Sequence, residues 1–207
     1  MLIAIAVATH ATAQSQQNTP LQSYVTQLDN AGSATTYRQL AEQFNQLANS
    51  EPNNWLAWYY AAFCNAKTAW LYQDDGDKIE PFADQADQQI AKALSLLDTS
   101  KQKKELSEVY VVMSMVNRAR VYINPMTYGP KYGPVASRYT QLALHANADN
   151  GRALYIAGWE KYATPKMWGG DKKKAKELFQ QALQHLNSQT GEAGPHWGKK
   201  EVEAIHH

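Results

Sequence analysis

The side chains that most often carry catalysis are few in this chain of 207 residues, and they stand apart in the sequence. Among the six histidines, His145 and His185 lie in helix-like segments rich in Gln, Asn and Ala. His196 has the most distinctive setting, Gly-Pro-His-Trp-Gly at 194–198, but no second His or Cys stands at the spacing of a metal-ligand pair. We expect a structural role here, in which Trp197 docks the C-terminal tail onto the last helix pair. A metal or catalytic role of His196 is the alternative.

The sequence motifs of common enzymes are also missing. The chain has no Gly-x-Ser-x-Gly elbow, no phosphate-binding Gly loop and no His-Glu-x-x-His helix. The acidic run at 74–77 lacks the ligand spacing and the closing Glu of a calcium loop. Cys64, the single cysteine, lies in an apolar helical stretch and is expected to be buried and inert. We therefore predict a protein that is not an enzyme, with no catalytic residues, no metal and no cofactor.

Composition narrows the classes of partner. The formal net charge is +1, so no strong field attracts nucleic acid or an anionic membrane surface. Aromatic residues are unusual in kind, because six Trp and twelve Tyr accompany only four Phe. Rings with a polar atom suit half-exposed grooves and interfaces. The composition thus favours a binding surface over a catalytic centre.

The N-terminus has the pattern of an export signal. A short apolar run at 2–8 precedes Ala11-Thr12-Ala13, the small-x-small form that signal peptidase cuts, although the usual basic residues before the run are missing. The run is too short to span a bilayer. We predict a signal peptide at 1–13 cleaved after Ala13, a polar linker at 14–20, a helical-repeat domain at 21–187 and a C-terminal tail at 188–207. The predicted location is periplasmic or secreted.

Internal repetition indicates the architecture. Residues 53–63 superpose without a gap on 149–159, and both segments place a large apolar residue, two small residues and an aromatic ring in the same order. The helices that follow repeat a small–large–small pattern at intervals of four and three, which lies on one helix face: Ala86, Ile90 and Ala93, then Ala175, Phe179 and Ala182. The sequence therefore predicts an all-α solenoid of about three to four antiparallel helix pairs.

This pattern resembles the tetratricopeptide repeat. Residues 150–186 match best, with Gly158, Ala175, Phe179 and Ala182 at consensus positions, and the unit at 55–97 is next. Some stretches resemble a group of secreted bacterial proteins of this type, namely Asn150-Gly151-Arg152-Ala153, the run from Thr164 to Asp171, and Pro195-His196-Trp197-Gly198. The resemblance implies the fold and export, and it carries no activity.

Two surfaces of such a solenoid are candidates for binding. First helices line the concave groove, where we expect a set of mostly aromatic side chains: Tyr59, Phe63, Arg118, Arg152, Tyr155, Trp159 and Tyr162. Extra residues occur at the turns 72–82, 124–135 and 164–170, and insertions at equivalent turns emerge along one edge. We expect those loops to carry a second set: Tyr72, Tyr128, Tyr132 and Trp168. The opposing interpretation is that these rings only pack over the helix ends.

The predicted function is non-catalytic binding. We expect an adaptor or scaffold of the bacterial envelope that holds a protein or peptide, because an aromatic groove with few charges suits an extended peptide. The alternative is a periplasmic protein that binds a small ligand or assists transport through the same aromatic groove. A deep closed pocket favours the small ligand, and an open shallow groove favours the polypeptide.

Overall fold

The computed structural model describes residues 19–188 and 194–206. The predicted signal peptide at 1–13 and most of the predicted linker lie outside this range. The described chain forms α-helices and two short 3-10 turns, without any strand in those residues. In order the elements are α1 (Pro20–Leu28), α2 (Ala34–Ser50), α3 (Trp55–Leu71), η1 (Gly76–Lys78), α4 (Ile79–Ser95), α5 (Lys103–Val121), α6 (Pro125–Ala146), α7 (Gly151–Ala163), η2 (Lys166–Trp168), α8 (Lys172–Ser188) and α9 (Lys199–His206).

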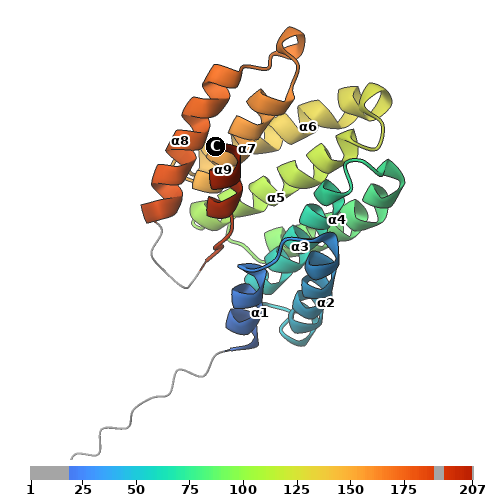
Figure 1. The fold of residues 1–207 in the computed structure, drawn as a ribbon. Helices are drawn as coiled ribbons and strands as arrows, with labels where there is room; N and C mark the ends of the chain where they lie inside the picture. The colour runs from blue at the N-terminus through green and yellow to red at the C-terminus, as the bar shows by residue number, and fades with distance from the viewer. Residues whose placement is uncertain (1–18, 189–193, 207) are drawn as a thin grey trace, which may run out of the picture.

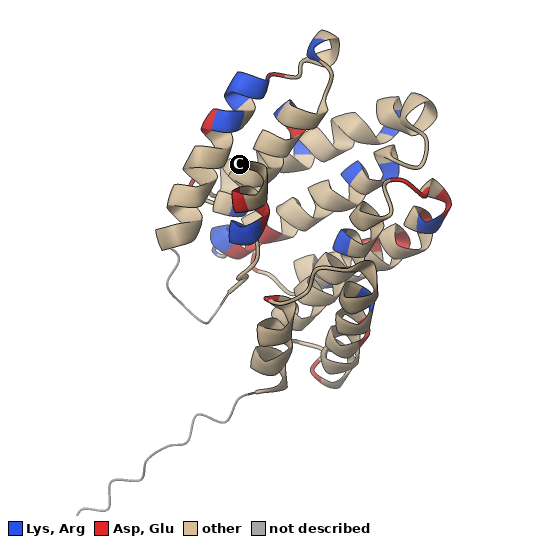
Figure 2. Cartoon of the chain, in the orientation of Figure 1, with Lys and Arg blue, Asp and Glu red and all other residues tan. Residues whose placement is uncertain are grey.

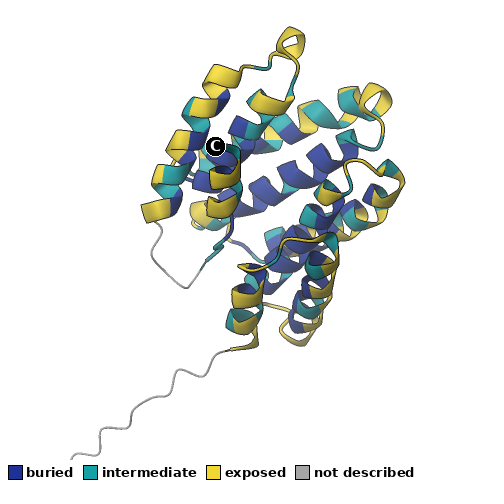
Figure 3. Cartoon of the chain, viewed as in Figure 1, coloured by how far each residue is buried: buried dark blue, intermediate teal, exposed yellow. Residues whose placement is uncertain are grey.

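Successive helices pack as pairs, α1 with α2, α3 with α4, α5 with α6 and α7 with α8 (Figure 1). The first helices α3, α5 and α7 contact one another in that order and line one face of the stack. α5 lies at the centre and is mostly buried after its first turn (Figure 3). The predicted all-α solenoid of antiparallel helix pairs is confirmed.

Side chains at the helix starts explain where the elements begin. Asn54 accepts hydrogen bonds from the backbone N–H groups of Leu56 and Ala57, both at 3.2 Å. Asn150 does the same at the start of α7, and Asp171 accepts from the N–H of Lys174 at 2.9 Å near the start of α8. These bonds satisfy N–H groups that have no partner inside the helix.

Small residues set the distance between paired helices. A Cβ placed on Gly158 would lie 2.7 Å from the ring of Phe179, so the approach of α7 to α8 depends on the missing side chain. Ala175 and Ala182, which flank Phe179 on α8, are buried. The repeat pattern in the sequence therefore marks positions of close helix contact.

The prediction of a loop at 124–135 is wrong, because these residues form the first turns of α6. Asn124 caps the helix, and Pro125 stands in the first turn, where its fixed φ suits a helix. Pro130 and Pro134 lie inside α6 and are exposed, so the carbonyl groups that lose a hydrogen-bond donor are on the solvent side. The long α6 thus extends the stack where a loop was expected.

Candidate functional site

The concave face of the stack is filled by the chain's own C-terminal segment, residues 194–206. The indole of Trp197 stacks on Phe63 with ring centroids 4.5 Å apart, and it meets Tyr155 edge-on at 6.4 Å. Its N–H donates to the hydroxyl of Tyr59 at 2.8 Å. Trp197 therefore docks between α3 and α7, across the centre of the groove, and not only onto the last helix pair as the sequence suggested.

A buried ion pair lies beneath this segment. Arg152 binds both carboxylate oxygens of Glu108, through Nε at 2.8 Å and Nη2 at 2.9 Å. A third nitrogen, Nη1, donates to the backbone carbonyl of Trp197 at 3.1 Å. Burial lowers the pKa of Arg152, but the carboxylate of Glu108 outweighs it and holds that pKa above its ordinary value. The guanidinium thus stays charged and links α5, α7 and the tail.

The residues predicted to line the groove do converge, but on this segment. Tyr59 and Phe63 are fully buried, and Arg152 and Tyr155 are 3% and 6% exposed. Burial raises the pKa of Tyr59 and of Tyr155 well above the ordinary phenol value. With the tail in place Tyr59, Phe63 and Tyr155 offer almost no surface to another molecule. Their predicted binding role stays a prediction.

The remaining groove residues lie toward the other end of α5 and α7. Arg118 pairs with Glu160 at 2.9 Å, Trp159 is half-buried against Trp70, and Tyr162 is 44% exposed. The Nε of Arg118 and the indole N–H of Trp159 are buried donors without an acceptor among the described residues. A buried donor without an acceptor costs free energy, so this region offers two unsatisfied hydrogen bonds.

Exposed apolar side chains gather at the edge where each first helix turns into its second. In the part of the chain that the structure describes, five of the six exposed large hydrophobic residues occur at these turns: Leu71, Met126, Tyr162, Met167 and Trp168. The sixth, Val135, lies further along α6. The connections between α3 and α4, α5 and α6, and α7 and α8 emerge on the same side of the stack (Figure 1). We call the five residues at the turns the apolar edge.

The tyrosines predicted for this edge are only partly available. Tyr72 stacks on Phe82 at 5.7 Å, and Tyr128 stacks on Tyr132 at 5.4 Å, so each packs locally. Trp168 is 68% exposed on η2. Of the residues predicted here, Trp168 is thus the ring that most clearly faces solvent.

Basic side chains accompany the apolar edge. The ammonium of Lys131 lies 4.7 Å from the ring of Tyr132, and that of Lys172 lies 5.4 Å from the ring of Tyr162. Figure 2 shows basic residues at the start of α8 and on the loop that precedes it. Around the starts of α6 and α8 the edge therefore combines apolar area with positive charge, whereas the α3–α4 connection is acidic (Figure 2).

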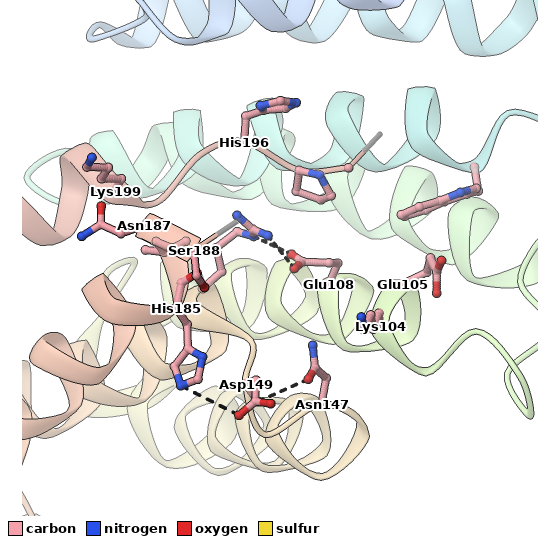
Figure 4. Close-up of a pocket in the computed structure, with 15 residues that line it drawn as sticks. Lys104, Glu105, Glu108, Asn147, Asp149, His185, Asn187, Ser188, His196 and Lys199 are labelled. Atoms are coloured by element: carbon pink, nitrogen blue, oxygen red, sulfur yellow. Dashed lines mark hydrogen bonds and ion pairs between the residues drawn. The ribbon is translucent and has the colours of Figure 1, made fainter. Parts of the chain in front are cut away.

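A pocket of about 770 Å³ lies at the opposite end of α5 and α7 (Figure 4). Charged and polar side chains dominate its wall, which includes Lys104, Glu105, Glu108, Asp149, Arg152 and Lys199. His185 is directed toward Asp149, whose Oδ1 lies 3.8 Å from its Nε2, and His196 lies on the far side of the pocket. The two histidines do not face one another, so they do not form a pair of ligands for one metal.

Residues 19–188 and 194–206 hold no group of three His, Cys, Asp or Glu side chains placed to bind a metal ion. None of their helices has the length and apolar character needed to cross a membrane. Cys64 is fully buried, as expected, and burial raises the pKa of its thiol.

Fold and surfaces together define a small helical-repeat scaffold with a closed groove and an open apolar edge. A similar solved structure is the HusA haemophore from Porphyromonas gingivalis, with a TM-score of 0.77 and 29% sequence identity over 90% of this chain and 89% of that chain. No protein-family model matches the chain, and no curated protein matches its sequence.

The sequence did not reveal the main occupant of the groove. Tyr60, for example, donates to the carbonyl of Gly194, 134 positions away, at 3.1 Å. No periodic pattern connects residues so far apart. The signal that pointed in this direction was the Trp in Gly-Pro-His-Trp-Gly, a large apolar residue in an otherwise polar tail.

Proposed function

We propose that this protein is an exported, non-catalytic carrier that binds haem at its apolar edge. The observation that carries the proposal is the similarity to a haemophore along nearly the whole of both chains. The match has a TM-score of 0.77 at 29% identity, so it supports a shared fold along nearly the whole chain. Export agrees with the predicted signal peptide. The scaffold is a tetratricopeptide-type repeat in this proposal.

The apolar edge fits haem better than the pocket does. Haem presents an apolar disc with two carboxylates at one rim. Placing that disc in the pocket would take the charges of Lys104, Glu105 and Asp149 out of water, which is costly. The edge instead offers exposed Met167 and Trp168, and an exposed apolar patch is a common mark of a binding site.

Polar groups at the edge match the rest of the ligand. Lys172 and Lys131 lie beside Tyr rings at the edge and supply positive charge for the carboxylates. Tyr and Met side chains are both known haem-iron ligands, and Tyr162, Met126 and Met167 are exposed here. Haem is the cargo in this proposal and not a resident cofactor.

The test is a titration of the purified mature chain with haem, followed by the Soret absorbance. The double variant Met167→Ala/Trp168→Ala is expected to bind haem at least about tenfold more weakly, since central apolar contacts dominate such interfaces. Trp55→Ala, a substitution in the polar pocket, is the matched control and is expected to bind like the wild type. Absence of haem binding, or equal affinity of the wild type and the double variant, would overturn the proposal.

A further inference from the structure

Charged side chains are divided between the two ends of the apolar edge. The connection between α3 and α4 carries three exposed carboxylates, those of Asp74, Asp75 and Asp77. The connection between α7 and α8, together with the start of α8, carries four exposed lysines: Lys166, Lys172, Lys173 and Lys174 (Figure 2). The edge is therefore acidic at one end and basic at the other, although the formal net charge of the whole chain is only +1.

Part of this charge has no partner inside the molecule. Asp74 and Asp77 form no ion pair with any described residue. At the other end of the edge, Lys166 and Lys173 form none either. Unpaired charges of opposite sign at the two ends of one surface favour contact with another charged surface in a defined orientation.

The middle of the edge is apolar. The connection between α5 and α6 lies between the other two connections (Figure 1), and it holds Met126, which is 79% exposed. Met167 and Trp168 follow toward the basic end and are 82% and 68% exposed. Large apolar side chains that are exposed together in this way mark a contact surface.

A two-fold axis at the middle of the edge would match this pattern with itself. In a pair of copies related by such an axis, each end of the surface meets the opposite end of the partner, and residues near the axis meet their own counterparts. The acidic connection of each copy would face the basic connection of the other, so the complementary contact occurs twice. Met126 would face Met126 of the partner subunit.

A membrane surface is the main alternative partner for an edge of this kind. Anionic lipids would attract the basic end, but they would repel the three carboxylates at the acidic end. A second copy of the chain satisfies both ends at once. The distribution of charge therefore favours self-association.

We propose that two copies of this chain pair through the apolar edge, in antiparallel orientation, about a two-fold axis near Met126. The interface is of the small, reversible kind, because three connections form it and not a whole helical face. The pairing does not require haem. Because haem and a second copy would both cover Met167 and Trp168, the pair is a state of the haem-free chain.

Sedimentation velocity of the haem-free mature chain at several concentrations measures the pairing. The wild type is expected to show a monomer–dimer equilibrium that weakens at least about tenfold between about 0.05 M and about 0.5 M salt, because salt screens exposed charges. Asp74→Lys/Asp77→Lys makes both ends basic, and Lys166→Glu/Lys172→Glu/Lys173→Glu makes both ends acidic. Each variant alone is expected to stay monomeric, whereas an equal mixture of the two is expected to form a heterodimer.

The matched control is Glu42→Lys/Glu203→Lys, which changes the net charge as much as Asp74→Lys/Asp77→Lys does, at exposed positions on α2 and α9. It is expected to pair like the wild type. A wild type that remains monomeric at about 1 mM would refute the proposal. So would two charge variants that fail to pair with each other although the wild type dimerises. Binding of the wild type to vesicles of phosphatidylcholine and phosphatidylserine without self-association would also refute it, and would assign the edge to a membrane.

A cysteine at the axis tests the arrangement of the two copies. Met126→Cys, oxidised in air with copper phenanthroline, is expected to form a covalent dimer, and Cys64 does not compete because it is fully buried. Ser100→Cys, on the exposed connection between α4 and α5, is the control and is expected to stay monomeric. A Met126→Cys chain that cross-links no better than the control would contradict the two-fold pairing.

Discussion

At the scale of single residues, Glu201 shows how the tail is held by charge. Its carboxylate pairs with Lys67 and accepts a hydrogen bond from the N–H of Gly198 at 3.0 Å. Burial alone would raise the pKa of Glu201, but Lys67 and the backbone donors outweigh it and hold the pKa below the ordinary value of 4.5. A carboxyl whose pKa is lowered by folding stabilises the protein above its unfolded pKa. That contribution is lost as the pH falls through the lower, folded value.

We therefore predict that Glu201→Gln makes the free energy of unfolding less dependent on pH in the acidic range. Between about pH 5 and pH 3, the free energy of unfolding of the wild type is expected to fall more steeply than that of the variant. Urea unfolding at several pH values measures the difference. Glu203→Gln is the control, because Glu203 is exposed and its ion pair with Lys199 is long, at 4.0 Å. Parallel curves for the wild type and Glu201→Gln would contradict the prediction.

At the scale of elements, the packing of α7 on α8 depends on one missing side chain. A Cβ at Gly158 would lie 2.7 Å from two atoms of the Phe179 ring, closer than contacts between such atoms allow. Gly158→Ala is therefore expected to destabilise the protein by about 1–3 kcal/mol, the usual cost of overpacking. The higher helix propensity of Ala, worth about 1 kcal/mol, offsets part of this. Urea unfolding at pH 7 measures it.

The control for this variant is Gly32→Ala, since no atom lies within 4 Å of a Cβ at Gly32 and its φ is not positive. A change of less than about 0.5 kcal/mol is expected there, as for most surface substitutions. A Gly158→Ala protein as stable as the wild type would show that Phe179 moves aside without cost.

Elements were predictable from sequence where the pattern was local. Gly158, Ala175 and Phe179 stand at regular spacings, so the close packing of α7 on α8 followed from the repeat. The start of α6 was not predictable in the same way, because Pro130 and Pro134 normally disrupt helices. Their cost is small here because both are exposed to solvent. Aromatic side chains of the groove were named from the sequence, but Glu108 and the segment that occupies the groove were not.

At the scale of the whole molecule, the tail changes how the stack holds together. In a simple solenoid each repeat contacts only its neighbours, so stability is a sum of local terms. Here α5 lies between α3 and α7, and Trp197 contacts Phe63 on one side of it and Tyr155 on the other. The segment therefore connects the second helix pair to the fourth directly.

This connection leads to a prediction about cooperativity. The wild type is expected to unfold in one transition, with the same midpoint by circular dichroism and by hydrogen exchange in α3 and α7. Trp197→Ala is expected to stay folded, because the loss is limited to the docking of the tail. The slope of its unfolding free energy against urea concentration should be smaller, since the two ends of the stack then open separately. Trp168→Ala, at an exposed position, is the control and should keep the single transition. A single, equally steep transition in Trp197→Ala would contradict the prediction. Contacts between neighbouring helix pairs would then make the stack cooperative without a contribution from the tail.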